Sequence, residues 1–401
     1  MTGSIKTIFI FFLVVVSINF FEAQFLDEKT FTYLQFFYMA IAIILSLPYF
    51  FHRRTGFVFP VQLMVVSILF SMVMAYVSWG QDFPDSLKAT VPLLTWIFFF
   101  YLLEKRVEID ILEKIILIYG FIYVALYFYQ VLNSDVVLFG WGDELEVDRG
   151  VLRIVFPGGG VFILASFIAL NKMSSKSSHR FVWFLMALAG PVVTFLQATR
   201  QFIFAVFFLY LFHLLKESRL YKKIVIVAGF VIFIIIMLRS ENLIFTGLAE
   251  AQKMTVQQGR DYIRFVSGYY FLSEFSPNTA SRIFGNGLPY GEKSSYGIFV
   301  ENLKDRGIYM TDVGLIGMYA LYGIFSVLAF ILIWIKSFKI SLPKEYYYLK
   351  YYLWFLLITS LTSSAVFFPY FLISTVFVLY IYQSILENQI CETEVDPDGL
   401  E

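Results

Sequence analysis

Arginine is the residue type in this chain that most clearly suggests chemistry. Several arginines follow one another in a hydrophilic stretch, residues 239–309, of an otherwise apolar sequence. Arg260 and Arg264 are four residues apart, so on a helix they would share one face. Two planar guanidinium groups there suit a diphosphate, because each binds phosphate oxygens in a bidentate manner. The same spacing is also typical of a solvated helix with an exposed ion pair of little energetic value.

A second candidate is Arg200, in the short polar turn 197–201 between two apolar runs. An arginine at this position either reaches lipid phosphate or joins a substrate site. The triplet Asp-Arg-Gly occurs at 148–150 and again at 305–307, each time with a glycine eleven residues past the arginine. The outward segment around the first triplet and the large outward loop contribute the candidate substrate-binding residues Arg149, Arg153, Arg282, Lys304 and Arg306.

Asp312 is the candidate for acid–base chemistry, because it opens the motif Asp-x-Gly-x-x-Gly at 312–317, where the chain returns to an apolar run. A carboxylate there serves either as a general base or as a first-turn residue that favours a helix N-terminus. The three histidines, His52, His179 and His213, are not expected in outward loops, which excludes a histidine base or a zinc site on that face. We expect no metal and no cofactor.

These residues must be positioned by membrane helices, because 59% of the 401 residues are hydrophobic and only 15% are charged. Apolar runs able to cross about 30 Å of hydrocarbon recur roughly twelve times. The sequence therefore predicts an all-α polytopic integral membrane protein with one large extracytoplasmic loop. The expected spans are 5–21, 31–51, 58–79, 89–103, 113–133, 151–170, 181–198, 201–215, 223–238, 311–335, 349–365 and 368–387.

Loop charges give the orientation. Lysine and arginine gather in alternate loops, as the positive-inside rule requires, and both termini are then cytoplasmic. The domain prediction is nine spans in 1–238, the large outward loop in 239–310, three spans in 311–387 and an acidic cytoplasmic tail in 388–401. Cys391 is the only cysteine, so no disulfide is expected.

Two other function classes fit the sequence less well. Secondary transporters and proton pumps bury ionisable residues in mid-helix, and the predicted spans are nearly free of them. The net charge is zero and no basic stripe with interleaved aromatic residues is present, so nucleic acid is an unexpected partner. A flippase or permease remains the alternative to an enzyme.

This pattern resembles the superfamily of O-antigen polymerases (Wzy-type) and O-antigen ligases. The likeness covers the topology of the whole chain, the Thr-Arg turn at 199–200, the arginines early in the large loop and the glycine motif at 312–317. Its members are membrane glycosyltransferases of the GT-C class that use no metal. The ligase branch has a histidine in the large loop, which this sequence lacks, so the resemblance favours a polymerase.

The resemblance implies roles for the candidate residues. Arg200, with Arg260 or Arg264, matches the arginines that hold the donor diphosphate, and Arg149 and Arg306 resemble arginines of the polymerase outer loops. Asp312 or Glu301 is the conjectural base. Donor and acceptor would be undecaprenyl-diphosphate-linked oligosaccharides at the outer face of a bacterial inner membrane, in the synthesis of O-antigen polysaccharide. A chain-length regulator, a flippase of the same pathway and membrane lipid are the expected partners.

Overall fold

The computed structural model describes residues 3–52, 55–140, 147–148, 151–175, 179–216, 262–291 and 294–395, together with 223, 224, 228 and 257. Regular structure in this part of the chain is almost entirely helical. The exception is a short antiparallel pairing of β1 (Val147–Asp148) with β2 (Val151–Leu152), in which Val147 lies opposite Leu152. The predicted all-helical class is confirmed.

The helices follow the apolar runs of the sequence. The first half of the chain contains α1 (Gly3–Ser17), η1 (Asn19–Glu22), α2 (Glu28–Ser46), η2 (Leu47–Tyr49), α3 (Val58–Trp79), α4 (Phe83–Thr90), η3 (Val91–Ile97), α5 (Phe98–Lys105), α6 (Ile109–Leu132), α7 (Gly159–Ser174), α8 (Arg180–Leu196) and α9 (Arg200–Lys216). The second half contains α12 (Ile263–Ser273), α13 (Thr279–Phe284), α14 (Ser295–Lys304), η7 (Met310–Asp312), α15 (Leu315–Tyr322), α16 (Ile324–Lys339), η8 (Lys344–Tyr346), α17 (Tyr347–Thr359), η9 (Ser364–Val366) and α18 (Pro369–Val395).

Five helical segments in the described part of the chain are long and apolar enough to cross a membrane. They are Lys29–Tyr49, Val58–Trp79, Phe83–Lys105, Ile109–Leu132 and Pro369–Ile390. Shorter apolar helices cover Ile5–Ser17, Gly159–Ser174 and Arg180–Leu196. The chain thus has the helices of a membrane protein, while the count of twelve spans stays a prediction.

Three predicted spans differ from the helices that form. In the run 151–170, helix begins only at Gly159, and in 349–365 it ends at Thr359. The run 311–335 is interrupted at Gly323, whose φ of +79° ends α15 and starts α16. A Cβ on Gly323 would lie 2.3 Å from the backbone oxygen of Ile283, so the break lets α13 approach. Hydropathy alone does not report such breaks. The predicted span 223–238 lies almost wholly outside the described residues.

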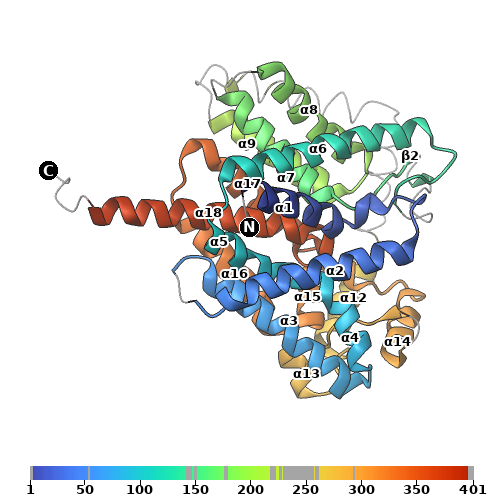
Figure 1. Ribbon diagram of the computed structural model, residues 1–401. Helices are drawn as coiled ribbons and strands as arrows, with labels where there is room; N and C mark the ends of the chain where they lie inside the picture. The colour runs from blue at the N-terminus through green and yellow to red at the C-terminus, as the bar shows by residue number, and fades with distance from the viewer. Residues whose placement is uncertain are drawn as a thin grey trace.

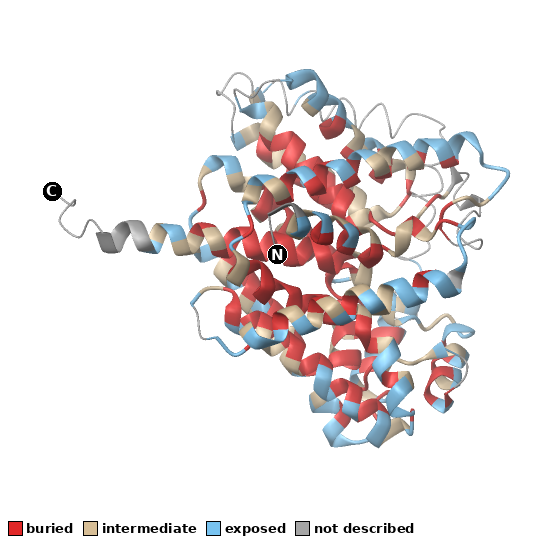
Figure 2. Cartoon of the chain, in the orientation of Figure 1, coloured by how far each residue is buried: buried red, intermediate tan, exposed pale blue. Residues whose placement is uncertain are grey.

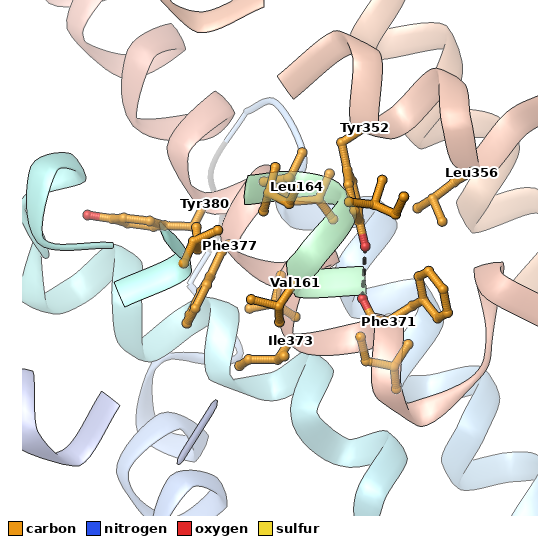
Figure 3. Close-up of a cluster of buried hydrophobic side chains, with 14 of the residues drawn as sticks. Val161, Leu164, Tyr352, Leu356, Phe371, Ile373, Phe377 and Tyr380 are labelled. Atoms are coloured by element: carbon orange, nitrogen blue, oxygen red, sulfur yellow. Dashed lines mark hydrogen bonds between the residues drawn. The ribbon is translucent and has the colours of Figure 1, made fainter. Parts of the chain in front are cut away.

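Helix α18 forms the centre of the molecule and projects beyond it at its C-terminal end (Figure 1). Its residues from Leu372 to Gln383 are all buried, in the interior that Figure 2 shows in red. Figure 3 shows Phe371, Ile373 and Phe377 of this helix near Tyr352 of α17 and Val161 of α7. The Tyr352 hydroxyl donates a hydrogen bond to the Phe371 backbone oxygen at 3.2 Å.

Large apolar side chains also lie on the outside of the helices. Phe37 of α2 is 60% exposed and Phe181 of α8 is 71% exposed, with many similar residues on α3. Soluble proteins rarely expose so much contiguous apolar surface, and lipid tails would cover it at no cost. The outer face of these helices therefore agrees with a location in a membrane.

The described part of the predicted large loop is folded. Helices α12, α13 and α14 lie beside α3, α4 and α15 (Figure 1). Helices α12 and α14 share with α15 a small core of buried side chains around Trp79 of α3, whose ring stacks on Tyr296 with centroids 4.6 Å apart. The Trp79 indole donates to the Asn286 side-chain oxygen at 2.8 Å.

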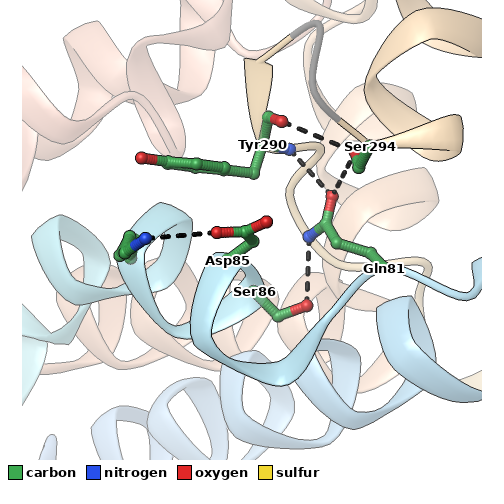
Figure 4. Close-up of polar contacts among 6 residues, drawn as sticks. Gln81, Asp85, Ser86, Tyr290 and Ser294 are labelled. Carbon is green, nitrogen blue, oxygen red and sulfur yellow. Dashed lines mark hydrogen bonds and ion pairs between the residues drawn. The ribbon is translucent and has the colours of Figure 1, made fainter.

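A buried glutamine fixes the connection between α13 and α14. The Gln81 side chain donates to Ser86 at 3.0 Å and accepts from the Tyr290 backbone nitrogen at 2.8 Å and from the Ser294 hydroxyl at 3.0 Å (Figure 4). All donors and acceptors of this amide are neutral, so the contact needs no charge compensation. The connection between α13 and α14 is thus tied to the corner between α3 and α4.

Candidate functional site

A cavity of about 940 Å³ opens where five separate segments meet. These segments are the stretch after β2, the turn between α8 and α9, the start of α12, the turn η7 with α15, and the residues after α17. Its charged lining residues among those described are Arg153, Arg200, Arg264 and Asp312. All four are sequence-predicted site residues, and the fold brings them together from positions far apart in the chain.

Arg200 is placed by a tight turn. Ala198 has a φ of +54°, which reverses the chain between two antiparallel helices, and α9 begins at Arg200 itself. The Thr199 backbone oxygen accepts the first helical hydrogen bonds of α9. Gln201 donates to the Thr362 backbone oxygen at 2.8 Å, and the Thr362 hydroxyl donates back to the Gln201 side chain. The half-buried Arg200 therefore sits on a fixed helix start, where the helix dipole also favours an anion.

Arg264 lies in the first turn of α12 and is held beside Asp312. The Arg264 Nε is 3.7 Å from the Asp312 Oδ2, and the two side chains are 29% and 44% exposed. Such a loose, solvated pair contributes little to stability. Both residues line the cavity.

The glycine motif explains where Asp312 lies. Gly314 has a φ of +53°, and a Cβ there would lie 1.8 Å from the Ser360 backbone oxygen. That same oxygen accepts a hydrogen bond from the Leu315 backbone nitrogen at 2.8 Å. The motif thus lets the start of α15, directly after turn η7, pack against Ser360 behind α17, and Asp312 and Thr362 both line the cavity.

Arg153 is half-buried in the extended stretch that leads to α7. Its Nε is buried and has no hydrogen-bond partner within the described part of the chain. An unsatisfied buried donor costs about 1–3 kcal/mol, so it calls for an acceptor. Arg153 lines the 940 Å³ cavity and also a neighbouring hollow of about 510 Å³.

Other predicted cations lie elsewhere. Arg282 donates to the Ser273 backbone oxygen at 3.0 Å and so caps the end of α12. Lys304 pairs with Glu301 at 2.7 Å and lines a smaller, apolar cavity of about 260 Å³. Burial raises the pKa of Tyr270, whereas the nearby charge of Arg306 lowers it, which puts Arg306 beside α12 and away from the cavity lining. Arg149 and Arg260 fall outside the described residues.

Sequence reasoning missed the polar residues after α17. Thr362 lines both cavities, and Ser363 and Ser364 line the hollow beside it. The signal was available, because hydroxyl residues occupy 359, 360, 362, 363 and 364, just before Pro369. Such a cluster is unusual within a predicted span and indicates that the chain leaves helical structure there.

The walls of the 940 Å³ cavity are apolar and open. Phe265 and Tyr269 of α12 are 66% and 67% exposed, and Phe204 of α9 is 63% exposed. The four charged lining residues carry two net positive charges. The site therefore offers a cationic end and an exposed apolar wall, which together suit an amphiphile with a multiply charged anionic head.

Comparison with models of known protein families gave no match, and comparison with curated protein sequences gave none either. The resemblance to O-antigen polymerases and ligases remains a prediction from topology and short motifs. A function for this chain has to account for three arginines beside an exposed apolar wall in one cavity.

Proposed function

We propose that this chain is a polysaccharide polymerase, a metal-independent membrane glycosyltransferase that joins lipid-linked repeat units. The observation that carries the proposal is the gathering of Arg153, Arg200 and Arg264 around one cavity with an apolar wall. The donor is a glycan on a polyprenyl diphosphate. The acceptor is a second lipid-linked unit.

An amphiphilic donor accounts for both parts of the cavity. The guanidinium groups bind the diphosphate oxygens, and the exposed rings of Phe204, Phe265 and Tyr269 contact the prenyl chain. A water-soluble sugar nucleotide would leave these rings exposed to solvent. The apolar wall beside the cations thus favours a lipid-linked donor over a soluble one.

The reaction transfers one glycosyl group. An acceptor hydroxyl oxygen attacks the anomeric carbon, the bond from that carbon to the diphosphate oxygen breaks, and the lipid diphosphate leaves as an anion. Fixed arginines stabilise the charge that develops on this leaving group. Asp312 is the only carboxylate among the described lining residues of the two larger cavities, and it takes the acceptor proton.

The ends of the helices support the proposed orientation. Arg200 and Lys216 are the two ends of α9, which has 17 residues and is therefore about 25 Å long. At the lysine end, Lys216 lies 3.5 Å from the Tyr347 ring centroid, and Asn171 bonds the backbone of Lys344. Lysines are typical of cytoplasmic helix ends, so their presence at this end supports a cytoplasmic location for it and an outer-face location for the arginine cavity. In this proposal the chain has about twelve spans, and both termini are cytoplasmic.

The test is the surface-polysaccharide ladder of a strain that lacks the gene. Complementation with wild type should restore long chains, whereas Arg200→Ala should leave a single repeat unit, because losing one fixed donor slows transfer by about 10²–10³. Arg180→Ala is the matched control, since Arg180 is exposed at the opposite end of α8. It should restore the full ladder.

Other outcomes would contradict the proposal. Long polymer that remains on its lipid carrier in the strain lacking the gene would identify a ligase. Single lipid-linked repeat units that accumulate at the inner face would identify a flippase. Full rescue by Arg200→Ala would show that the Arg200 guanidinium is not needed for the reaction, which would contradict the proposed site.

A further inference from the structure

The hollow of about 510 Å³ beside the arginine cavity differs from it in chemistry. The two share Arg153, Arg264 and Asp312 along their common border. Away from that border the described lining is uncharged. It combines hydroxyl groups with aromatic rings, and its polar members are Tyr123, Gln197, Thr199, Gln201, Tyr309, Thr311, Thr362, Ser363, Ser364 and Tyr370.

This composition selects a class of ligand. Hydroxyl and amide groups both donate and accept hydrogen bonds, as the hydroxyls of a sugar do. Aromatic rings supply flat apolar faces for the C–H groups of a sugar ring. A second diphosphate would find no further cations here, and a hydrocarbon chain would leave many polar groups without partners. The volume lies within the range of about 300–1,000 Å³ typical of small-molecule sites.

Part of the polar lining holds the hollow in shape. Gln201 and Thr362, which both line it, bond each other, and Gln197 donates to the Tyr123 hydroxyl at 2.8 Å. These contacts fix the α8–α9 turn to α6 and to the residues after α17. The frame is therefore set before any ligand binds, which lowers the cost of binding.

Other polar groups are left for a ligand. The side chains of Tyr309, Thr311 and Ser364 make no hydrogen bond to any described residue, although all three line the hollow. Tyr309 is 41% exposed, so its ring and hydroxyl are both accessible. It precedes Asp312, the proposed base, in the chain, and both residues line the hollow.

We propose that this hollow is the saccharide subsite, in which Tyr309 and Thr311 contact the sugar next to the diphosphate and help to set which sugar is accepted. The inference rests on the proposed function, because the diphosphate must occupy the arginine cavity for its sugar to enter the hollow. The shared border at Arg153, Arg264 and Asp312 then lies at the bond between sugar and phosphate. Sites built to bond substrate hydroxyls discriminate strongly against analogues that lack them.

Two probes separate the hollow from the cavity. The full-length protein in lipid nanodiscs is titrated with undecaprenyl diphosphate, and with lipid-linked repeat units extracted from a strain of the source organism that lacks the gene. Tyr309→Ala and Thr311→Val should each raise the Kd of the glycan-bearing lipid about tenfold and leave the Kd of the bare lipid unchanged. Tyr309→Phe, which keeps the ring, should give a smaller change.

Arg200→Ala provides the contrast, because it should raise the Kd of both probes. Binding of the bare lipid reports whether each hollow variant is still folded. If Tyr309→Ala raises the Kd of both probes equally, or of neither, the assignment of the hollow as a saccharide subsite is wrong, while the proposed function stands. If the wild type binds neither probe, or Arg200→Ala changes neither Kd, the proposed function itself fails.

Discussion

At the scale of residues, the site contains one buried guanidinium donor that no described residue satisfies. Three arginines and one aspartate line the cavity, and among them the buried Nε of Arg153 has no described partner. Such an arrangement costs stability and is retained where an anionic ligand supplies the missing acceptors. Activity and stability should therefore respond in opposite directions to a change at Arg153.

Arg153→Met tests this trade-off. The substitution removes a donor whose burial costs about 1–3 kcal/mol and keeps a long apolar stem. We expect a thermal midpoint equal to or above that of wild type, together with loss of long polymer from the surface ladder. Arg180→Met, at an exposed site away from the cavity, is the control and should restore the ladder. A fall in midpoint of several degrees for Arg153→Met would show that the guanidinium stabilises the fold instead.

At the scale of elements, the turns between helices determine the site more than the helices do. Ala198, Gly314 and Gly323 all have positive φ values, and each one ends or starts a helix near the cavity or near the loop helices packed beside it. Turn η7 is the clearest case, because it carries Asp312 and leads through Gly314 to Leu315, whose backbone nitrogen donates to the Ser360 oxygen.

Gly314→Ala should disrupt this turn. Its φ of +53° is unfavourable for alanine, and the new Cβ would lie 1.8 Å from the Ser360 oxygen. Gly80→Ala is the matched control, since Gly80 has a φ of +66° and nothing within 4 Å of an added Cβ. We expect Gly80→Ala to cost about 1–2 kcal/mol of stability and to keep activity, because only the backbone strain is shared. Gly314→Ala should cost more stability than Gly80→Ala and should abolish polymer formation. Equal effects of the two substitutions on the thermal midpoint and on the polysaccharide ladder would contradict this expectation.

At the scale of the whole molecule, the two ends of the helices carry different chemistry. Lysines collect at one end, where the buried Glu113 contacts Lys172 at 2.6 Å and the Tyr348 hydroxyl at 2.7 Å. The arginine cavity lies at the other end of α7 and α9. In the orientation proposed from loop charges, the lysine end of these helices is cytoplasmic and the arginine-cavity end faces outward.

The single cysteine makes this orientation measurable. In a Cys391→Ser background, new cysteines replace Leu361, which is 75% exposed at the cavity end, or Ser341, which is exposed at the lysine end. A membrane-impermeant thiol reagent should label Leu361→Cys in spheroplasts and should label Ser341→Cys only after permeabilisation. The reverse pattern would place the arginine cavity in the cytoplasm.

Hydropathy and charge by themselves determined the class of this protein and the position of most helices. The run 58–79, for example, became α3 over the same residues. These signals act over about twenty consecutive residues, the length that crosses a membrane, so they can be read locally. The arginine candidates were equally visible, because guanidinium chemistry does not depend on the fold.

Tertiary structure alone decided which candidates meet. Arg153, Arg200, Arg264 and Asp312 line one cavity, whereas Arg282 and Arg306 do not, although all are outward cations or acids by sequence. No local pattern showed that the hydroxyl residues after α17 would line a hollow, or that Gly323 would break the run 311–335 to admit α13. The reason is physical: a cavity forms where segments distant in sequence pack imperfectly, and no local pattern records which neighbours a segment will have.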